Sequence, residues 1–195
     1  SGKEQNIPVK REEVDIKNVP HYSMVSEEVG YVVLTTFTQS AANNIAAAIN
    51  ELKSKNPGLK SLILDLRGNG GGLLNEAIQI CNLFVAKDLP IVSTRGKIQE
   101  QDFTYKTMSA PLDEKIPLAI LIDKNSASAS EIVSGTIQDL DRGVVIGQLS
   151  YGKGLVQNTK DIGYNAKVKI TTSRYYIPSG RCIQAVNYKD GEPVH

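Results

Sequence analysis

The sequence predicts an α/β fold of alternating strands and helices. Residues 62–66 are apolar except for one aspartate, as is typical of a strand covered on both faces, and a glycine-rich turn connects them to a helical pattern at 73–85. The alternation continues with an apolar run at 118–123, a helical stretch at 128–140 and a second apolar run at 143–147. Strands and helices that alternate in this way form parallel sheets, so we expect stacked β-α units.

Strands of two other kinds flank this core. Residues 30–37 are a β-branched run that precedes Ser40, a predicted N-cap, and a helix that extends to Lys53. Residues 166–172 alternate with a period of two, and 174–177 lead into a Pro-Ser-Gly turn. We therefore expect antiparallel additions near the C-terminus.

The chain divides into two segments by composition. Residues 1–29 are polar and charged, and we interpret them as a lead-in segment or linker. Four apolar residues between positions 7 and 16 predict a short edge strand ahead of Pro20. Residues 30–195 are expected to form the core domain, because a chain of 195 residues is most often one domain with one core.

Composition and charge argue against several classes of protein. The formal charge is +1, from 22 Lys and Arg against 21 Asp and Glu, so no global field attracts nucleic acid or an anionic membrane. No apolar run approaches the ~20 residues that span a bilayer. Cys81 and Cys182 lack metal-ligand spacing and are expected to be free thiols, buried or half-buried.

Two interpretations fit the glycine-rich turn. Its glycines either permit positive φ angles and tight packing, or they let backbone amides at a helix N-terminus donate to negative charge, as an oxyanion hole requires. The dinucleotide-binding fingerprint does not fit, because Gly68 and Gly70 would need a glycine at position 73, which is Leu. A P-loop does not fit residues 147–154, because Gly154 stands where the Mg²⁺-binding hydroxyl is needed.

Three serines, Ser126, Ser128 and Ser130, lie at the start of the predicted helix at 128–140. Ser128 and Glu131 have the spacing of a capping box, which by itself is a structural role. An N-cap serine is also well placed for a nucleophile, because nearby helix amides stabilise the oxyanion that forms when it attacks a carbonyl. The residue pattern alone does not choose among the three serines.

A serine nucleophile needs a group that takes its proton. The chain has only two histidines, His21 and His195, so Lys153, which is flanked by glycines, is the available substitute. To act as a base, its pKa must fall by roughly 3 units from about 10.4, which burial in a dry site can impose. Gln157 would orient the lysine where the two meet in the folded loop.

Four sequence blocks, at 65–72, 126–132, 150–157 and 171–181, resemble the core of the carboxy-terminal processing peptidases, also called tail-specific proteases. The blocks follow one another in the same order and spacing, and the resemblance covers residues 8–187. It implies a Ser-Lys serine endopeptidase with a crotonase-like core that is related in architecture to Clp protease.

The resemblance implies a role for each matched residue. Ser128 is expected to be the nucleophile and Lys153, 25 positions later, the general base, with Gln157 orienting the lysine. The backbone amides of Gly71 and Ala129 are expected to form the oxyanion hole. No metal or organic cofactor is implied.

The resemblance also implies a biological context. Family members cleave protein or peptide substrates with accessible C-termini, and they work in the bacterial cell envelope, the periplasm or another extracytoplasmic space. They usually carry a PDZ domain ahead of the core, and residues 1–29 contain no PDZ pattern, so we expect the parent protein to have a PDZ domain that this chain lacks. Homo-oligomerisation stays open, whereas neither nucleic acid nor a membrane is an expected partner.

Two other classes of protein remain compatible with the sequence. A catalytically silent crotonase-like scaffold would bind a peptide or another ligand in the same groove, although both Ser128 and Lys153 are present. A crotonase-type acyl-coenzyme A hydratase or hydrolase would share the fold alone.

Overall fold

The structure is a computed structural model of the chain, and it describes residues 4–5, 7–12, 17–189 and 192–194. Its helices and strands are, in chain order, β1 (His21–Met24), β2 (Val29–Val33), α1 (Ala41–Lys55), β3 (Ser61–Asp65), α2 (Leu74–Asn82), β4 (Pro90–Gly96), the short 3₁₀ helix η1 (Gln99–Gln101), β5 (Phe103–Lys106), β6 (Leu118–Ile122), α3 (Ala129–Asp139), β7 (Val144–Gly147), β8 (Leu155–Gly163), β9 (Ala166–Tyr176), β10 (Asn187–Lys189) and β11 (Glu192–Val194).

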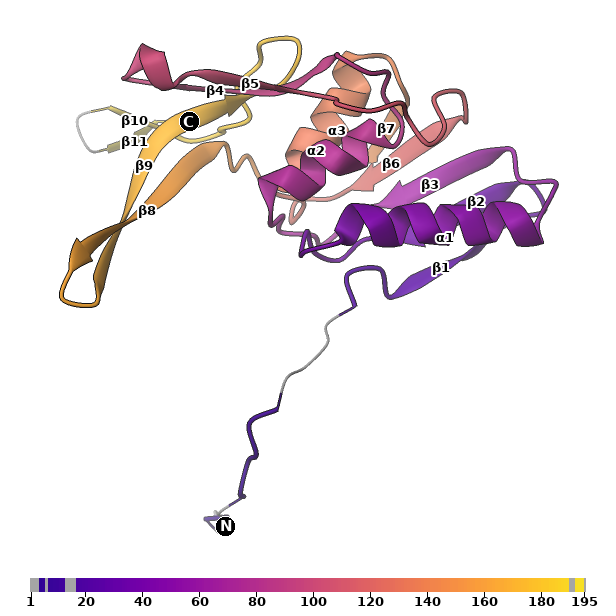
Figure 1. The fold of residues 1–195 in the computed structure, drawn as a ribbon, viewed down its shortest axis with the longest axis horizontal. Coiled ribbons are helices and arrows are strands. Elements are labelled where there is room, and N and C mark those ends of the chain that lie inside the picture. Colours follow the sequence, from indigo (N-terminus) through magenta and orange to yellow (C-terminus); the bar gives the residue numbers. More distant parts are fainter. Residues whose placement is uncertain (1–3, 6, 13–16, 190–191, 195) are drawn as a thin grey trace.

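The main sheet has five strands in the order β1-β2-β3-β6-β7, of which β2, β3, β6 and β7 run parallel and β1 is antiparallel. Val32, Leu64 and Ile120 form one cross-strand row, and all three are buried. Ile45 of α1 and Ile137 of α3 belong to the same core, and α2 contacts both of these helices (Figure 1). The predicted α/β architecture of alternating strands and helices is confirmed.

The start of α1 shows how a distant residue completes a helix end. Ser40 is the N-cap, as predicted, but it has a positive φ of 67° and its side chain does not cap the helix. The amides of Ser40 and Ala42 instead donate to the carboxylate of Glu76, each at 2.9 Å. Because Glu76 lies in the first turn of α2, this carboxylate joins the two helices.

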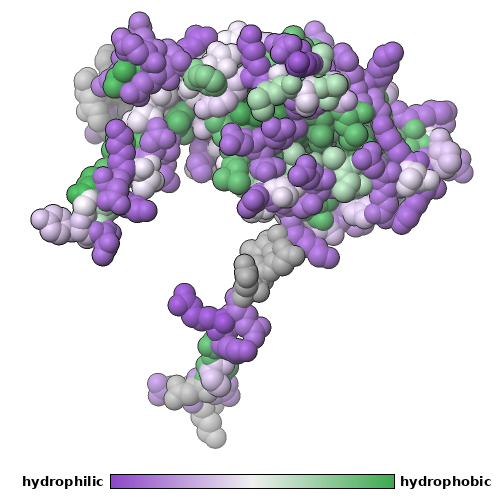
Figure 2. All heavy atoms as spheres, in the orientation of Figure 1, coloured by the Kyte–Doolittle hydropathy of each residue, from purple (hydrophilic) through white to green (hydrophobic). Residues whose placement is uncertain are grey.

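A second, antiparallel sheet has the order β5-β4-β9-β8 and confirms the predicted antiparallel additions. Its β8–β9 hairpin projects from the body of the molecule (Figure 1), and hydrophilic and hydrophobic side chains are mixed along this arm (Figure 2). Tyr164 and Asn165 at its tip have φ angles of 49° and 57°, as a tight hairpin turn requires. Strand β8 was not predicted, because its side chains are mostly exposed and give no alternating pattern.

The N-terminal part of the sheet differs from the sequence prediction. The edge strand is β1, which follows Pro20 rather than preceding it. Ile7 and Val9 are exposed and lie outside any strand, while residues 13–16 lie outside the described residues. Asn18 is buried and donates from Nδ2 to Thr38 Oγ1 at 3.0 Å. The folded sheet therefore begins within the segment that the sequence assigned to a lead-in.

The two cysteines are free, as predicted, but they lie in different surroundings. Cys81 is fully buried in α2, and this burial raises its pKa to about 12, whereas Cys182 is half-buried. We expect iodoacetamide at about pH 8 to alkylate Cys182 of the folded protein and to spare Cys81, because the thiolate is the reacting form. Peptide mass spectrometry would show this, with urea-unfolded protein as the control; equal labelling of both cysteines in the folded state would contradict it.

None of the helices within the described ranges has the length and apolar character needed to cross a membrane.

Candidate active site

Three loops meet at one edge of the main sheet. We call residues 67–72 the glycine loop, 123–128 the serine turn and 148–154 the lysine loop, and they follow β3, β6 and β7 respectively. These three strands are neighbours and run parallel, so their carboxyl ends lie at the same edge. This is the edge at which parallel α/β sheets usually carry their functional sites.

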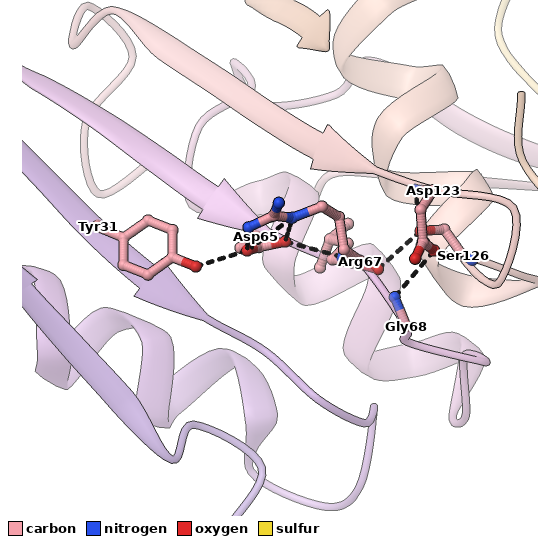
Figure 3. Close-up of polar contacts among 7 residues, drawn as sticks. Tyr31, Asp65, Arg67, Gly68, Asp123 and Ser126 are labelled. Carbon is pink, nitrogen blue, oxygen red and sulfur yellow. Dashed lines mark hydrogen bonds and ion pairs between the residues drawn. The ribbon is translucent and has the colours of Figure 1, made fainter. Parts of the chain in front are cut away.

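Asp123 holds the glycine loop against the serine turn. Its Oδ1 accepts hydrogen bonds from the amides of Gly68 and Asn125, each at 2.9 Å, and from the amide of Ser126 at 3.1 Å (Figure 3). The bond from Gly68 is the main reason why the pKa of Asp123 lies below its usual value. Because Gly68 and Asp123 are far apart in the sequence, this contact fixes the two loops relative to each other.

The three candidate serines have different surroundings. Ser126 and Ser130 are fully buried, and their hydroxyls donate to the carbonyl oxygens of Leu66 at 2.8 Å and of Asn69 at 2.9 Å. Ser126 thus attaches the serine turn to the residue that precedes the glycine loop, and Ser130 attaches the first turn of α3 to the glycine loop itself. Ser128 is half-buried at the N-cap of α3, which makes it the most accessible of the three hydroxyls.

The backbone of Ser128 is held in an unusual conformation, with φ 56° and ψ −111°. A non-glycine residue with such angles costs of order 1–3 kcal/mol and persists only when neighbouring contacts impose it. On one side the amide of Ala127 donates to the carbonyl of Asn69 at 3.0 Å, and on the other the amide of Ser128 donates to Glu131 Oε2 at 2.7 Å. The capping-box spacing of Ser128 and Glu131 is confirmed, and the Glu131 side chain makes its half of the box by accepting from the Ser128 amide.

Gly71 packs directly against the serine turn. Its φ is +96°, and a Cβ atom there would lie 2.7 Å from the carbonyl oxygen of Ala127 and 2.9 Å from the amide nitrogen of Ala129. Glycine is therefore required at this position. The Gly71 amide, predicted to belong to an oxyanion hole, donates to the side-chain oxygen of buried Asn69 at 2.9 Å. In this structure that amide already has an acceptor.

Lys153 belongs to the lysine loop, and Gln157 belongs to the strand β8 that follows it. The amide of Lys153 donates to Glu131 Oε2 at 2.9 Å, so the backbone of the lysine loop is fixed near Ser128. The side chain of Lys153 is exposed, as is that of Gln157 in β8. Among the described residues, no hydrogen bond joins the Lys153 ammonium to Ser128. The expectation of a dry lysine site is wrong for this structure, because the β8–β9 hairpin leaves the body directly after Lys153 (Figure 1).

An ion pair between the buried carboxylate of Asp65 and the exposed side chain of Arg67 supports the start of the glycine loop. Arg67 Nη2 lies 2.6 Å from Asp65 Oδ2, and the hydroxyl of Tyr31 donates to the same oxygen at 2.6 Å (Figure 3). Burial alone would raise the pKa of Asp65, but the hydrogen bonds from Arg67 and Tyr31 outweigh it and lower the pKa. The carboxylate thus fixes the residue at which β3 turns into the loop.

Replacing Asp65 with asparagine is expected to lower the free energy of unfolding by about 1 to 2 kcal/mol near neutral pH, because the amide leaves donors unpaired. A carboxylate whose pKa is lowered by folding stabilises the protein above its unfolded pKa of about 3.9, and this contribution disappears as the pH falls through the folded pKa. The difference between the two proteins should therefore narrow below about pH 4. Urea unfolding at a series of pH values would measure it; a constant difference would contradict the pairing.

A cavity of about 460 Å³ lies beside the site. It is lined in part by Ile122, Glu131, Leu149, Ser150, Ile177 and Cys182. Its lining does not include Ser128, Lys153 or Gln157, so this cavity is not the space in which the predicted catalytic side chains would meet.

Comparison with known proteins agrees with the geometry. The model of the family described as "Peptidase family S41" matches residues 28–190, which is most of the chain. The chain belongs to peptidase family S41. This membership places it among serine-type peptidases and confirms the resemblance to the carboxy-terminal processing proteases.

Two curated relatives and one solved structure illustrate the match. A carboxy-terminal-processing protease of Bartonella bacilliformis is 40% identical over 183 residues, covering 93% of this chain and 42% of the relative. A probable CtpA-like serine protease of Staphylococcus aureus is 32% identical over 191 residues, covering 96% and 37%. The structure of a photosystem II D1 C-terminal processing protease superposes with a TM-score of 0.77 at 28% identity, covering 89% and 47%. The chain thus spans about two-fifths of the length of these curated relatives.

Proposed function

We propose that this chain is the catalytic core of a serine endopeptidase that cleaves protein substrates near their carboxy termini, with Ser128 as the nucleophile. The observation that carries the proposal is the difference between the three serines. Ser126 and Ser130 are buried and donate to carbonyl oxygens, whereas Ser128 stays accessible on a strained turn at the N-terminus of α3. A nucleophile needs both accessibility and a fixed direction.

The reaction follows the Ser-Lys form of acyl transfer. Ser128 Oγ attacks the carbonyl carbon of the scissile peptide while the neutral amine of Lys153 takes its proton. The tetrahedral intermediate then collapses, the C–N bond breaks, and Lys153 returns the proton to the leaving amine. Water attacks the remaining ester with Lys153 again as base, which releases the new carboxyl group and restores the serine hydroxyl.

Lys153 must be neutral for this role, and its side chain is exposed in the isolated chain. Bound substrate or further protein that covers the lysine would favour its neutral amine, since burial disfavours the charged form. Gln157, four residues further on, is the proposed partner that orients the lysine amine. The backbone of the loop needs no rearrangement for this step, because its amides are already bound at Glu131.

The oxyanion of the intermediate would bind the backbone amides of Ala129 and Gly71. Ala129 is the first residue of α3, where the helix dipole favours negative charge. The Gly71 amide would exchange its present acceptor, Asn69 Oδ1, for the oxyanion. The close packing of Gly71 on the serine turn supports this assignment.

The names of the relatives support the proposed substrates and place of action. Because the relatives are described as carboxy-terminal-processing and D1 C-terminal processing proteases, we extend that specificity to protein or peptide substrates with accessible C-termini. An extracytoplasmic site of action and a PDZ domain ahead of the core belong to the same proposal, with residues 30–195 and the preceding strand β1 as the peptidase core.

The test is degradation of an unfolded protein that ends in an apolar carboxy terminus. The chain, its Ser128→Ala variant and a longer form with a preceding PDZ domain are compared by gel and mass spectrometry. The proposal is supported if the chain or the longer form cleaves the substrate and the Ser128→Ala substitution abolishes that cleavage. Absence of cleavage in all forms contradicts it and favours the silent binding scaffold.

A further inference from the structure

We propose that Glu131 is a positioning residue that couples the nucleophile to the general base. In this inference, which rests on the proposed function, its carboxylate fixes the lysine loop relative to the serine turn. Glu131 does not touch the reacting atoms, so its effect would act through the backbones of Ser128 and Lys153.

The carboxylate of Glu131 accepts four hydrogen bonds. Oε2 accepts from the amides of Ser128 at 2.7 Å and of Lys153 at 2.9 Å. Oε1 accepts from the amide of Gly152 at 2.6 Å and from the hydroxyl of Ser150 at 2.8 Å. Glu131 itself is only 4% exposed. Every one of these donors is an amide or a hydroxyl, and the ion pairs found among the described residues do not include Glu131.

A capping role explains just one of these four bonds. In a capping box the glutamate needs only the amide of its own N-cap residue, which here is Ser128. The other three donors come from Ser150, Gly152 and Lys153, which lie 19 to 22 residues later and are not part of the helix. The surplus contacts therefore serve the lysine loop rather than the stability of α3.

The arrangement of the donors explains the coupling. The amides of Ser128 and Lys153 bind the same oxygen atom, so the position of one backbone determines that of the other. Within the described part of the chain, one further hydrogen bond joins the two loops, from the amide of Tyr151 to the carbonyl of Ser126 at 3.0 Å. The lysine loop is also bonded to a third segment, because the carbonyls of Gly152 and Gly154 accept from the amides of Ala185 at 3.1 Å and Tyr175 at 2.8 Å. Those bonds do not involve the serine turn, so Glu131 remains the main link that sets the position of Lys153 relative to Ser128.

The chemistry of the site requires a carboxylate at position 131. Two donors meet each carboxylate oxygen, and a carboxylate can accept at both. Glutamine has the same shape but replaces one oxygen with an NH₂ group, which would face two other donors and leave them unpaired. Bonds from amides to a buried carboxylate are also stronger than bonds to a neutral acceptor.

Glu131→Gln is therefore expected to lower kcat for peptide cleavage by about 100-fold or more with KM changed by less than about threefold, because misplaced catalytic groups slow the chemical step. Glu76→Gln is the matched control. Glu76 also binds two amides at the N-terminus of a helix, those of Ser40 and Ala42, but it belongs to α2 and holds α1. The Glu76→Gln variant should therefore have a kcat within about threefold of that of the unchanged protein. Equal losses in kcat for the two variants, or a change in KM alone for Glu131→Gln, would overturn the proposal.

Amide hydrogen exchange gives a readout that needs no catalysis. In Glu131→Gln the amides of Gly152 and Lys153 should exchange faster than in the unchanged protein, while core amides of β3 and β6 stay protected. If those two amides keep their protection, Glu131 does not hold the lysine loop and the proposal is overturned. Hydrogen exchange also separates the two proposals. If the unchanged protein shows no Ser128-dependent cleavage, the proposed peptidase function is contradicted, but the role of Glu131 in holding the lysine loop is not.

If Glu131→Gln does not fold, Glu131→Asp takes its place. Aspartate keeps the carboxylate but is one methylene shorter, so it can hold the amide of Ser128 or those of the lysine loop, not both sets. The expected result is the same faster exchange at Gly152 and Lys153 with a kcat loss of at least about tenfold. A kcat and an exchange pattern equal to those of the unchanged protein would overturn the proposal.

Discussion

Replacing Lys153 with alanine is expected to lower kcat/KM for peptide cleavage by about 10³- to 10⁵-fold, because a serine hydroxyl without a base is a poor nucleophile. The fold should be unaffected. The Lys153 side chain is exposed, and exposed substitutions usually change stability by less than about 0.5 kcal/mol, so the thermal midpoint should move by less than about 2 °C. A peptide-cleavage assay and a thermal melt on the same sample measure both.

Two further variants sharpen this test. Lys153→Arg keeps the positive charge but cannot lose its proton near neutral pH, so it should be as inactive as the alanine variant. Lys160→Ala removes another exposed lysine, in the β8–β9 hairpin, and should leave cleavage unchanged. Activity of Lys153→Ala within about tenfold of the unchanged protein would remove this lysine from the mechanism.

Gly71→Ala should both destabilise the protein and abolish cleavage. A left-handed backbone costs an alanine about 1 kcal/mol, and the clash of its Cβ with the serine turn adds roughly 2 to 3 kcal/mol, because backbone atoms there cannot move aside easily. Chemical unfolding should therefore show a loss of about 3 to 4 kcal/mol. Cleavage should be lost because the same clash displaces the turn that carries Ser128.

Gly180→Ala is the control for this prediction. Gly180 has a similar φ of +84°, but nothing lies within 4 Å of a Cβ placed there. The Gly180→Ala variant should lose only about 1 kcal/mol of its free energy of unfolding, from the left-handed backbone, and it should keep its activity. If the two alanine variants were equally stable, the close approach of Gly71 to the serine turn would not be a requirement of the fold.

The sequence was sufficient for the succession of core strands and helices along the chain, because long apolar runs and helical periodicity are local signals. It was insufficient for β8, whose residues are exposed on both faces and carry no alternation. It also misplaced the N-terminal edge strand, since the short segment His21–Met24 has little apolar character of its own. Pairing with β2 decides that strand, and pairing is a tertiary contact.

The candidate site was only partly accessible to sequence reasoning. The motif after β3 and the serines before α3 predicted which loops matter, but three residues that join these loops were missed as connectors: Asn69, Asp123 and Glu131. Glu131 was interpreted only as a helix cap, and its spacing from Ser128 was the sole signal. Its other donors lie 19 or more residues away, and they come into reach only because β7 pairs beside β6. Such contacts depend on strand order, which a local pattern does not encode.

The central claim is that Ser128 forms the acyl-enzyme, and the most direct measurement is the mass of that intermediate. The protein would be mixed with an activated peptide ester, quenched in acid within the first turnovers, and digested for peptide mass spectrometry. We expect the acyl group on the peptide that contains Ser128, and no adduct in Ser128→Ala. An adduct on another residue, or steady turnover of the ester by Ser128→Ala, would contradict the account.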